Sequence, residues 1–240
     1  YDPSAMEAFR NHEPGSYAAY YDKYSRVGAI KADELRNYYL ANLNNLDDNI
    51  GRVLDALKEQ NLAKNTLIVF VSDNGGSPLT GANNAPLTGG KYSLWEGGIR
   101  VPMAISWPGK IEANNVVTDY VSATDILPTL LDAAGIEIQD PALDGISLLK
   151  PDKNRLLVWK WQKTWAVRQG DWKLTNAHEN HWKSEPSVQY IAPIVDNNEL
   201  KLFNVTLDPG ERKDVATRYP EKVKALEIAY KNWCDANIKK

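Results

Sequence analysis

Residues 66–75 combine a short apolar run with polar residues that could bind a cation. The apolar and β-branched content of residues 66–71 predicts a strand buried on both faces. In open α/β sheets, ligands bind just beyond the carboxyl ends of such strands. Asp73 and Asn74 follow at that place, and their oxygen atoms suit a hard cation such as calcium or magnesium. The alternative is a plain turn in which Gly75 takes a positive φ.

A second group of polar residues lies in the segment 75–98, which contains 7 of the 15 glycines. The segment has little periodicity, which predicts a long functional loop rather than regular structure. Lys91 follows two glycines, and glycines let the backbone approach a ligand closely. Lys91 is therefore either a ligand-binding residue or an ordinary surface lysine. Asn83, Asn84 and Thr88 lie in the same loop and could contact a substrate.

Hydrophobic periodicity predicts the elements that position these residues. An apolar stripe that begins at Tyr39 and ends at Leu57 indicates a long helix ahead of the first strand. Residues 1–32 are expected to be irregular with short helical pieces. We expect a helix from Asp33 to about Gln60, a buried strand at 101–107, a short extended piece at 116–121, and a helix capped by Thr124 or Asp125 that runs through Ala134.

Beyond residues 146–154 the sequence becomes rich in tryptophan and alternates in part between apolar and polar residues. We therefore place a boundary there, between units 1–150 and 151–240. The second unit is predicted to be a small antiparallel meander packed with one helix from Pro220. Its strands are expected at 156–161, 164–168, 171–175 and 201–204. Tryptophans cluster in this sheet and offer a carbohydrate platform, but most are expected in the core, with one or two exposed near the site.

Composition limits the classes of partner. The chain has 240 residues, a formal net charge of −3 and no long run of one sign, so a nucleic-acid or membrane-surface partner is not expected. The longest apolar run is far too short to span a bilayer. The single cysteine, Cys234, excludes an intrachain disulfide.

Several short motifs occur in a specific order. They are S-D-N-G at 72–75, G-G-K at 89–91, E-G-G-I-R-V-P at 96–102, W-P-G at 107–109, D-I-L-P-T-L at 125–130, D-G at 144–145, L-F-N-V at 202–205 and D-P-G-E at 208–211. Together they resemble the formylglycine-dependent sulfatases of the alkaline phosphatase superfamily, over most of the chain. The resemblance implies an α/β fold: part of an alkaline-phosphatase-like mixed sheet flanked by helices, followed by a small antiparallel sheet packed with a C-terminal helix.

The resemblance also implies roles for individual residues. Asp73 would be a carboxylate ligand and Asn74 an amide-oxygen ligand of calcium, with magnesium or manganese as alternatives. Lys91 would contact the sulfate group and steady the leaving oxygen. Glu96 and Arg100, which are four residues apart, are interpreted as a structural ion pair that holds the loop onto the sheet.

His178 and His181 are also candidates for the site. Two histidines three residues apart can ligate zinc on a helix, but no third ligand is evident and the local pattern is typical of a loop. The family resemblance favours a substrate-contacting loop at the border of the active-site cleft. We therefore expect both histidines to bind substrate.

The nucleophile of this family is a formylglycine made from Cys or Ser in a C/S-x-P-x-R motif, and no such motif occurs here. Cys234 has no following Pro or Arg and is interpreted as structural. The chain opens at Tyr1 without an initiator Met. We therefore expect a carboxyl-terminal portion whose missing N-terminal half carries the nucleophile and the other metal ligands, and which is inactive alone.

The predicted function is part of a calcium-dependent sulfatase that acts on a sulfated carbohydrate or aryl sulfate. Family resemblance alone suggests a periplasmic or secreted location. Two alternatives stay open: a phosphodiesterase or phosphonate monoester hydrolase of the same superfamily, and a non-catalytic glycan-binding fragment.

Overall fold

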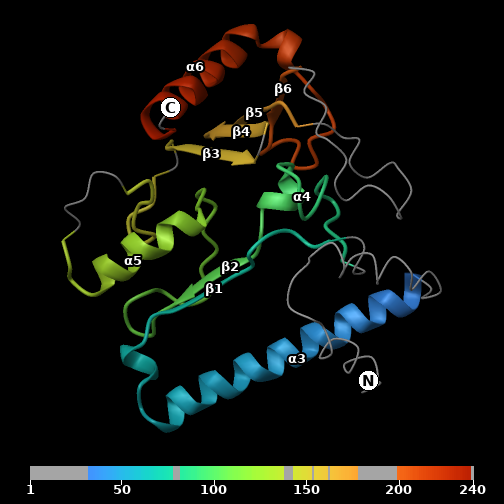
Figure 1. The fold of residues 1–240 in the computed structure, drawn as a ribbon. Helices are drawn as coiled ribbons and strands as arrows, with labels where there is room; N and C mark the ends of the chain where they lie inside the picture. The colour runs from blue at the N-terminus through green and yellow to red at the C-terminus, as the bar shows by residue number, and fades with distance from the viewer. Residues whose placement is uncertain are drawn as a thin grey trace.

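The computed structural model describes residues 32–77, 82–137, 143–152, 154–161, 163–177 and 199–238. The expectations for the first 31 residues, and for His178 and His181, lie outside these ranges. No helix among the described residues is both long and apolar enough to cross a bilayer. The elements form a lower part with α3 (Ala32–Glu59), β1 (Ile68–Val71) and β2 (Met103–Ser106), and an upper part with a four-stranded sheet under α6 (Pro220–Asn237) (Figure 1).

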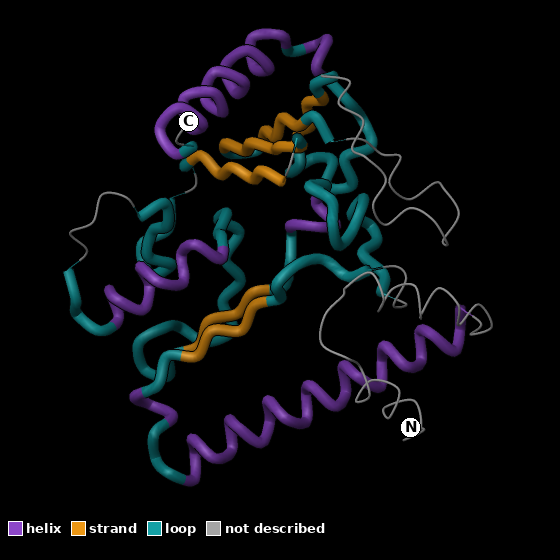
Figure 2. The backbone as a smooth tube through the Cα atoms, in the orientation of Figure 1, coloured by secondary structure: helices purple, strands orange, loops and turns teal. Residues whose placement is uncertain are grey.

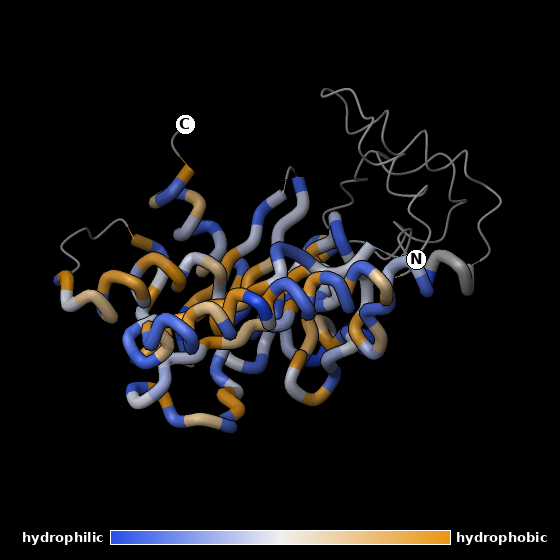
Figure 3. The backbone as a smooth tube through the Cα atoms, turned by 90° about the horizontal axis from the view of Figure 1, so that it is seen from below, coloured by the Kyte–Doolittle hydropathy of each residue, from blue (hydrophilic) through white to orange (hydrophobic). Residues whose placement is uncertain are grey.

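The long helix α3 (Ala32–Glu59) has the bounds that the apolar stripe predicted, to within one residue at each end. Its residues alternate between hydrophobic and hydrophilic along its length (Figure 3). Leu43, Leu46 and Val53 of the stripe are exposed in the described structure. A 3₁₀ turn, η1 (Ala63–Asn65), then leads into the first strand.

β1 (Ile68–Val71) and β2 (Met103–Ser106) form a two-stranded antiparallel sheet, with Ile68 opposite Ser106. The prediction that the first strand is buried on both faces is wrong for the described structure, since Phe70 is 41% exposed. The physical reason is that the described residues add no further strand to this sheet, so its faces lack the cover that a buried strand requires.

The segment after β2 also differs from expectation. Residues 116–121 form no strand, and Val116 is 84% exposed, because no described strand lies beside them to pair with. The following helix, α5 (Ile126–Ala133), is entered through the 3₁₀ turn η3 (Ala123–Asp125). The 3₁₀ turn is capped by Ser122 in a capping box with Asp125. Asp125 also occupies the N-cap position of α5, as expected, but its side chain makes no capping hydrogen bond to that helix.

The small sheet follows the predicted meander. Its strands β3 (Leu156–Trp161), β4 (Thr164–Gln169), β5 (Trp172–Thr175) and β6 (Lys201–Asn204) pair in sequence order, all antiparallel. The closing helix α6 (Pro220–Asn237) follows the 3₁₀ turn η5 (Ala216–Arg218) and lies over one face of the sheet (Figure 1).

Each face of the small sheet has its own apolar cluster, as the alternation of strand side chains requires. On the α6 side, Val167, Leu174 and Leu202 pack with Leu226. On the other side, Phe203 packs with Trp95, which comes from the loop between β1 and β2. Among the described residues of that loop, Glu96–Ile99 form one short helix, α4, and the others are irregular (Figure 2). The small sheet therefore shares its core with the glycine-rich loop.

Asp125 is the polar centre of the region around α5. It is fully buried, and its carboxylate accepts hydrogen bonds from the Ser122 and Ile146 backbone N–H groups. Arg155 donates to both carboxylate oxygens at 2.5 Å. This bidentate pair connects the start of β3 to the start of α5.

Replacing Asp125 by alanine should destabilise the protein by about 3–5 kcal/mol, because the substitution leaves the buried Arg155 charge without its partner. The measurement is urea-induced unfolding. Asp55→Ala is the matched control, since Asp55 pairs with Lys58 in an exposed ion pair that should contribute little. Equal losses for the two variants would contradict this account of Asp125.

Candidate functional site

The end of β1 is held by the loop that carries α4. The Gly75 N–H donates to the Gly98 carbonyl at 2.9 Å. A Cβ atom at Gly75 would lie 1.7 Å from the Gly97 carbonyl oxygen, so only glycine fits there. Gly75 is not among the residues with positive φ, so the left-handed Gly75 expected for a plain turn is not found.

Asp73 and Asn74 lie side by side at this end of the strand. One Asp73 carboxylate oxygen accepts the Asn74 backbone N–H at 2.8 Å. The Asn74 side-chain nitrogen donates to the Gly75 carbonyl at 3.0 Å, and the Ser72 hydroxyl donates to the Asn74 carbonyl. The Asn74 amide is thereby oriented by its nitrogen, and its oxygen accepts no hydrogen bond from the described residues.

The donor set fits a hard cation in part. A carboxylate and an amide oxygen are typical calcium ligands, but calcium takes six to eight oxygens. Within the described ranges, no three His, Cys, Asp or Glu side chains form a group that could hold a metal ion. Asp73 and Asn74 can therefore supply only part of a coordination shell.

Asn84 connects the two sides of the glycine-rich loop. Its side-chain oxygen accepts the Gly76 N–H at 2.9 Å, and its nitrogen donates to the carbonyls of Gly76 and Gly89. These bonds occupy both polar ends of the amide, so the structure gives Asn84 a positioning role in the loop. A substrate contact of Asn84 stays a prediction, as does the role of His178 and His181.

Lys91 is joined to the same loop by its backbone. Its N–H donates to the Gly76 carbonyl, two residues after Asn74. Its ammonium nitrogen lies 5.4 Å from the centroid of the Tyr92 ring. Gly76 is therefore hydrogen-bonded to both Asn84 and Lys91, which holds both residues near the end of β1.

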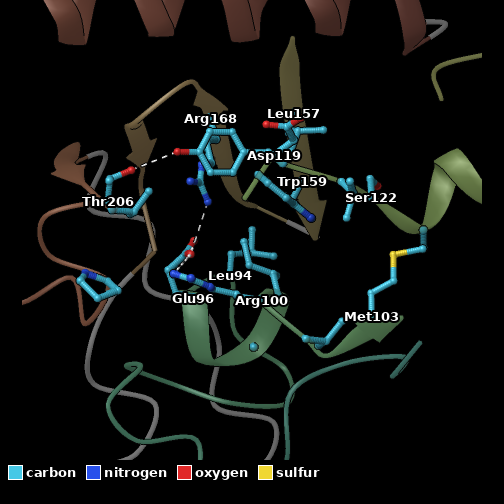
Figure 4. Close-up of a pocket in the computed structure, with 18 of the residues that line it drawn as sticks. Leu94, Glu96, Arg100, Met103, Asp119, Ser122, Leu157, Trp159, Arg168 and Thr206 are labelled. Carbon is cyan, nitrogen blue, oxygen red and sulfur yellow. Dashed lines mark hydrogen bonds and ion pairs between the residues drawn. The ribbon is translucent and has the colours of Figure 1, made fainter. Parts of the chain in front are cut away.

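A cavity of about 1480 Å³ opens beside β1 and extends to the small sheet. Its walls include Asp73, Asn74 and Tyr92 from the lower part, and Trp159 and Trp161 from β3. Lys91 is not among the residues that line it. The close-up of the cavity shows Trp159 and Arg168 on the small sheet facing Glu96 on α4 and Arg100 just after it (Figure 4).

Glu96 is the centre of a buried charge cluster that sequence reasoning missed. Lys173 on β5 is fully buried, and its ammonium lies 3.0 Å from Glu96 Oε1 and 2.8 Å from Glu211 Oε1. The other Glu211 oxygen accepts the Glu96 N–H at 2.6 Å. Arg168 lies 3.5 Å from Glu96 Oε2 (Figure 4).

The expected pair of Glu96 with Arg100 is present, but it is the longest of these contacts at 3.9 Å, and the Arg100 side chain is 55% exposed. The stronger partners lie 77 residues away in Lys173 and 115 residues away in Glu211. Two features of the sequence could have indicated this cluster: the glutamate of the D-P-G-E motif, Glu211, and a lysine inside a predicted strand, Lys173.

Polar contacts extend from this cluster across the small sheet. The Arg168 guanidinium lies 3.4 Å from the Tyr120 ring centroid. Hydrogen bonds from Thr206 and Tyr120 to the Asp171 carboxylate lower the pKa of Asp171 below its usual value. Burial raises the pKa of Glu211, although the charge of Lys173 opposes that shift.

Comparison with known proteins identifies the chain. A family model described as Sulfatase matches residues 9–136, which is more than half of the chain. The chain belongs to the sulfatase family. A second model, described as N-sulphoglucosamine sulphohydrolase, C-terminal, matches residues 90–231.

Relatives of known name support this membership. Arylsulfatase J of Mus musculus is 30% identical over 89% of the chain, and steryl-sulfatase of the same species is 30% identical over 81%. The matched region is 41% of the first relative and 37% of the second. The sulfatase chain therefore spans about two fifths of the length of these relatives.

Solved structures show the fold. The chain resembles the crystal structure of Ps i-CgsB in complex with k-i-k-neocarrahexaose, with a TM-score of 0.71, 28% identity and coverage of 93% of this chain and 48% of that one. The PsFucS1 sulfatase from Pseudoalteromonas sp. gives a TM-score of 0.66 at 28% identity, over 80% of this chain and 41% of that one. The expected α/β class and the family resemblance are confirmed.

The raised pKa of Glu211 predicts a pH-dependent difference in stability between wild type and Glu211→Gln. The folded protein holds the Glu211 proton more tightly than the unfolded chain. Wild type should therefore lose stability relative to the variant as pH rises from about 4.5 through the raised pKa, and the difference should then level off. Urea unfolding at a series of pH values measures it. Parallel profiles, or a difference of opposite sign, would contradict the assignment.

Proposed function

We propose that this chain forms the carboxyl-terminal part of a calcium-dependent sulfatase that hydrolyses sulfate esters of carbohydrates or aryl compounds. The observation that carries the proposal is the junction at Gly76, which holds Lys91 and Asn84 next to the strand end that presents Asp73 and Asn74. Sulfatase family membership supports the reaction class.

The proposed roles follow from the chemistry of each side chain. Asp73 and Asn74 would supply two oxygen ligands, and the bound calcium would supply positive charge that polarises the sulfate oxygens. The Lys91 ammonium would bind the sulfate group and stabilise negative charge that develops on the leaving oxygen. Asn84 would keep the Lys91 loop in place through its three backbone hydrogen bonds.

The nucleophile is proposed to lie outside this sequence. The C/S-x-P-x-R motif that yields formylglycine does not occur in the 240 residues, and the chain spans about two fifths of its relatives. An upstream segment would carry the formylglycine and the remaining calcium ligands, so these residues alone are proposed to be inactive. A periplasmic or secreted location is part of the same proposal and rests on family resemblance.

Lys91→Ala should lower kcat for sulfate esters by about 10²–10³-fold in the product of the complete reading frame, because the substitution removes a charge that stabilises the transition state. The assay compares sulfate with phosphate esters, which also tests the phosphodiesterase alternative. Lys110→Ala, in an exposed turn, is the matched control. An unchanged rate in Lys91→Ala with intact folding would remove Lys91 from the mechanism.

Asn74→Ala should weaken calcium binding by at least about tenfold, since loss of a direct ligand should cost no less than loss of a residue that only orients one. Titration calorimetry on the same protein gives the affinity. Asn115→Ala, at an exposed position after β2, should leave the affinity unchanged. Equal affinities for Asn74→Ala and wild type would show that Asn74 is not a ligand.

A further inference from the structure

We propose that Tyr92 and Trp161 form an aromatic platform that binds a sugar ring of a sulfated saccharide beside Lys91. The proposal deepens the function proposed above and rests on it, because it assigns the substrate class of the same site. Aromatic faces bind the apolar faces of sugar rings, and the adjacent ammonium would receive the sulfate group.

The backbone of Tyr92 is the first observation. Its φ is +72°, in the left-handed region that is rare for a bulky residue. The same loop uses glycine at φ +80° in Gly89. A tyrosine in such a conformation is energetically costly, and residues held in this way cluster at active sites and ligand clamps. The ring of Tyr92 should therefore have a function that offsets the strain.

The position of the ring is the second observation. Tyr92 stacks with Trp161 at the end of β3, with ring centroids 6.3 Å apart and an interplanar angle of 30°. Both residues line the cavity that Asp73 and Asn74 also line. Trp161 is 38% exposed, so the pair presents aromatic surface to the cavity.

Other tryptophans of the small sheet are occupied by packing. Trp165 stacks on Tyr230 with centroids 4.0 Å apart, and Trp172 contacts Tyr219 edge to face. Trp159 packs against the cluster that contains Leu94 and Trp95. Trp161 differs because its described ring contact is with Tyr92 at the cavity wall.

The neighbourhood of the platform indicates an extended anionic substrate. The Lys91 ammonium lies 5.4 Å from the Tyr92 ring centroid, so a sugar on that ring would bring its sulfate close to the amine. The cavity walls run from Asp73 and Asn74 at the end of β1 to Trp161 on β3, which favours a substrate that extends along the wall over a simple aryl sulfate.

The test uses the product of the complete reading frame with calcium, sulfated hexasaccharides prepared from carrageenan and heparin, and 4-nitrophenyl sulfate as the small ester. Tyr92→Gly and Trp161→Ala should each weaken binding of at least one hexasaccharide by about five- to tenfold in calorimetry. For that substrate KM should rise with little change in kcat. The rise in KM should be larger for that hexasaccharide than for 4-nitrophenyl sulfate, which has no sugar ring to bind to the platform.

Tyr92→Gly has a second readout that separates binding from folding. Glycine accepts φ +72°, so the variant should be at least as thermally stable as wild type while it binds saccharide more weakly. Asn114→Gly is the matched control: Asn114 also has a positive φ, +58°, and lies outside the cavity walls, so its replacement relieves strain without removing the platform. Its saccharide affinity should equal that of wild type.

The outcomes separate this inference from the proposed function. If wild type binds neither hexasaccharide, or if both platform variants bind them as wild type does, the platform is overturned even where 4-nitrophenyl sulfate is hydrolysed in a Lys91-dependent way. If no sulfate ester is hydrolysed, the proposed function fails, and the direct binding measurement still decides the platform.

Discussion

The buried ammonium of Lys173 sets the main constraint on this structure. A charge removed from water is tolerated only when it is paired and hydrogen-bonded. Lys173 lies on β5, but its partners Glu96 and Glu211 come from α4 and from the loop after β6. The small sheet can therefore bury Lys173 only when both loops have closed on it. The Glu96 N–H also donates to Glu211, so each of Lys173, Glu96 and Glu211 contacts the other two.

The backbone of α4 connects this buried charge cluster to the candidate site. Gly97 and Gly98 follow Glu96, and a Cβ atom at either would lie within 2.5 Å of a carbonyl oxygen of the glycine-rich loop. The Gly98 carbonyl then accepts the Gly75 N–H at the end of β1. Charge burial in the small sheet and the placement of the proposed calcium ligands are thus parts of one connected arrangement. The two matched family models overlap at residues 90–136, the segment that makes this connection.

Local patterns predicted much of the fold. The period of α3, the four strands of the meander and the start of α6 at Pro220 depend on neighbouring residues, and all appear where expected. The burial of β1 and the pairing of residues 116–121 depend on strands from elsewhere, which the local pattern does not contain. The boundary between units 1–150 and 151–240 stays a prediction.

Sequence motifs named only some residues of the candidate site. Asp73, Asn74 and Lys91 belong to short motifs, so their types and order could be read directly. Lys173 carried no such signal, because its role depends on two carboxylates from distant loops. The left-handed backbone of Tyr92 could not be predicted from the sequence either, since its φ is set by the packing of the loop around it.

A crystal structure of the product of the complete reading frame, grown with calcium and sulfate, would locate both ions relative to Asp73, Asn74 and Lys91. The account predicts calcium about 2.3–2.6 Å from an Asp73 carboxylate oxygen and the Asn74 amide oxygen. It also predicts a sulfate oxygen about 2.7–3.2 Å from the Lys91 ammonium. Calcium bound away from Asp73 and Asn74, or sulfate held without Lys91, would contradict it.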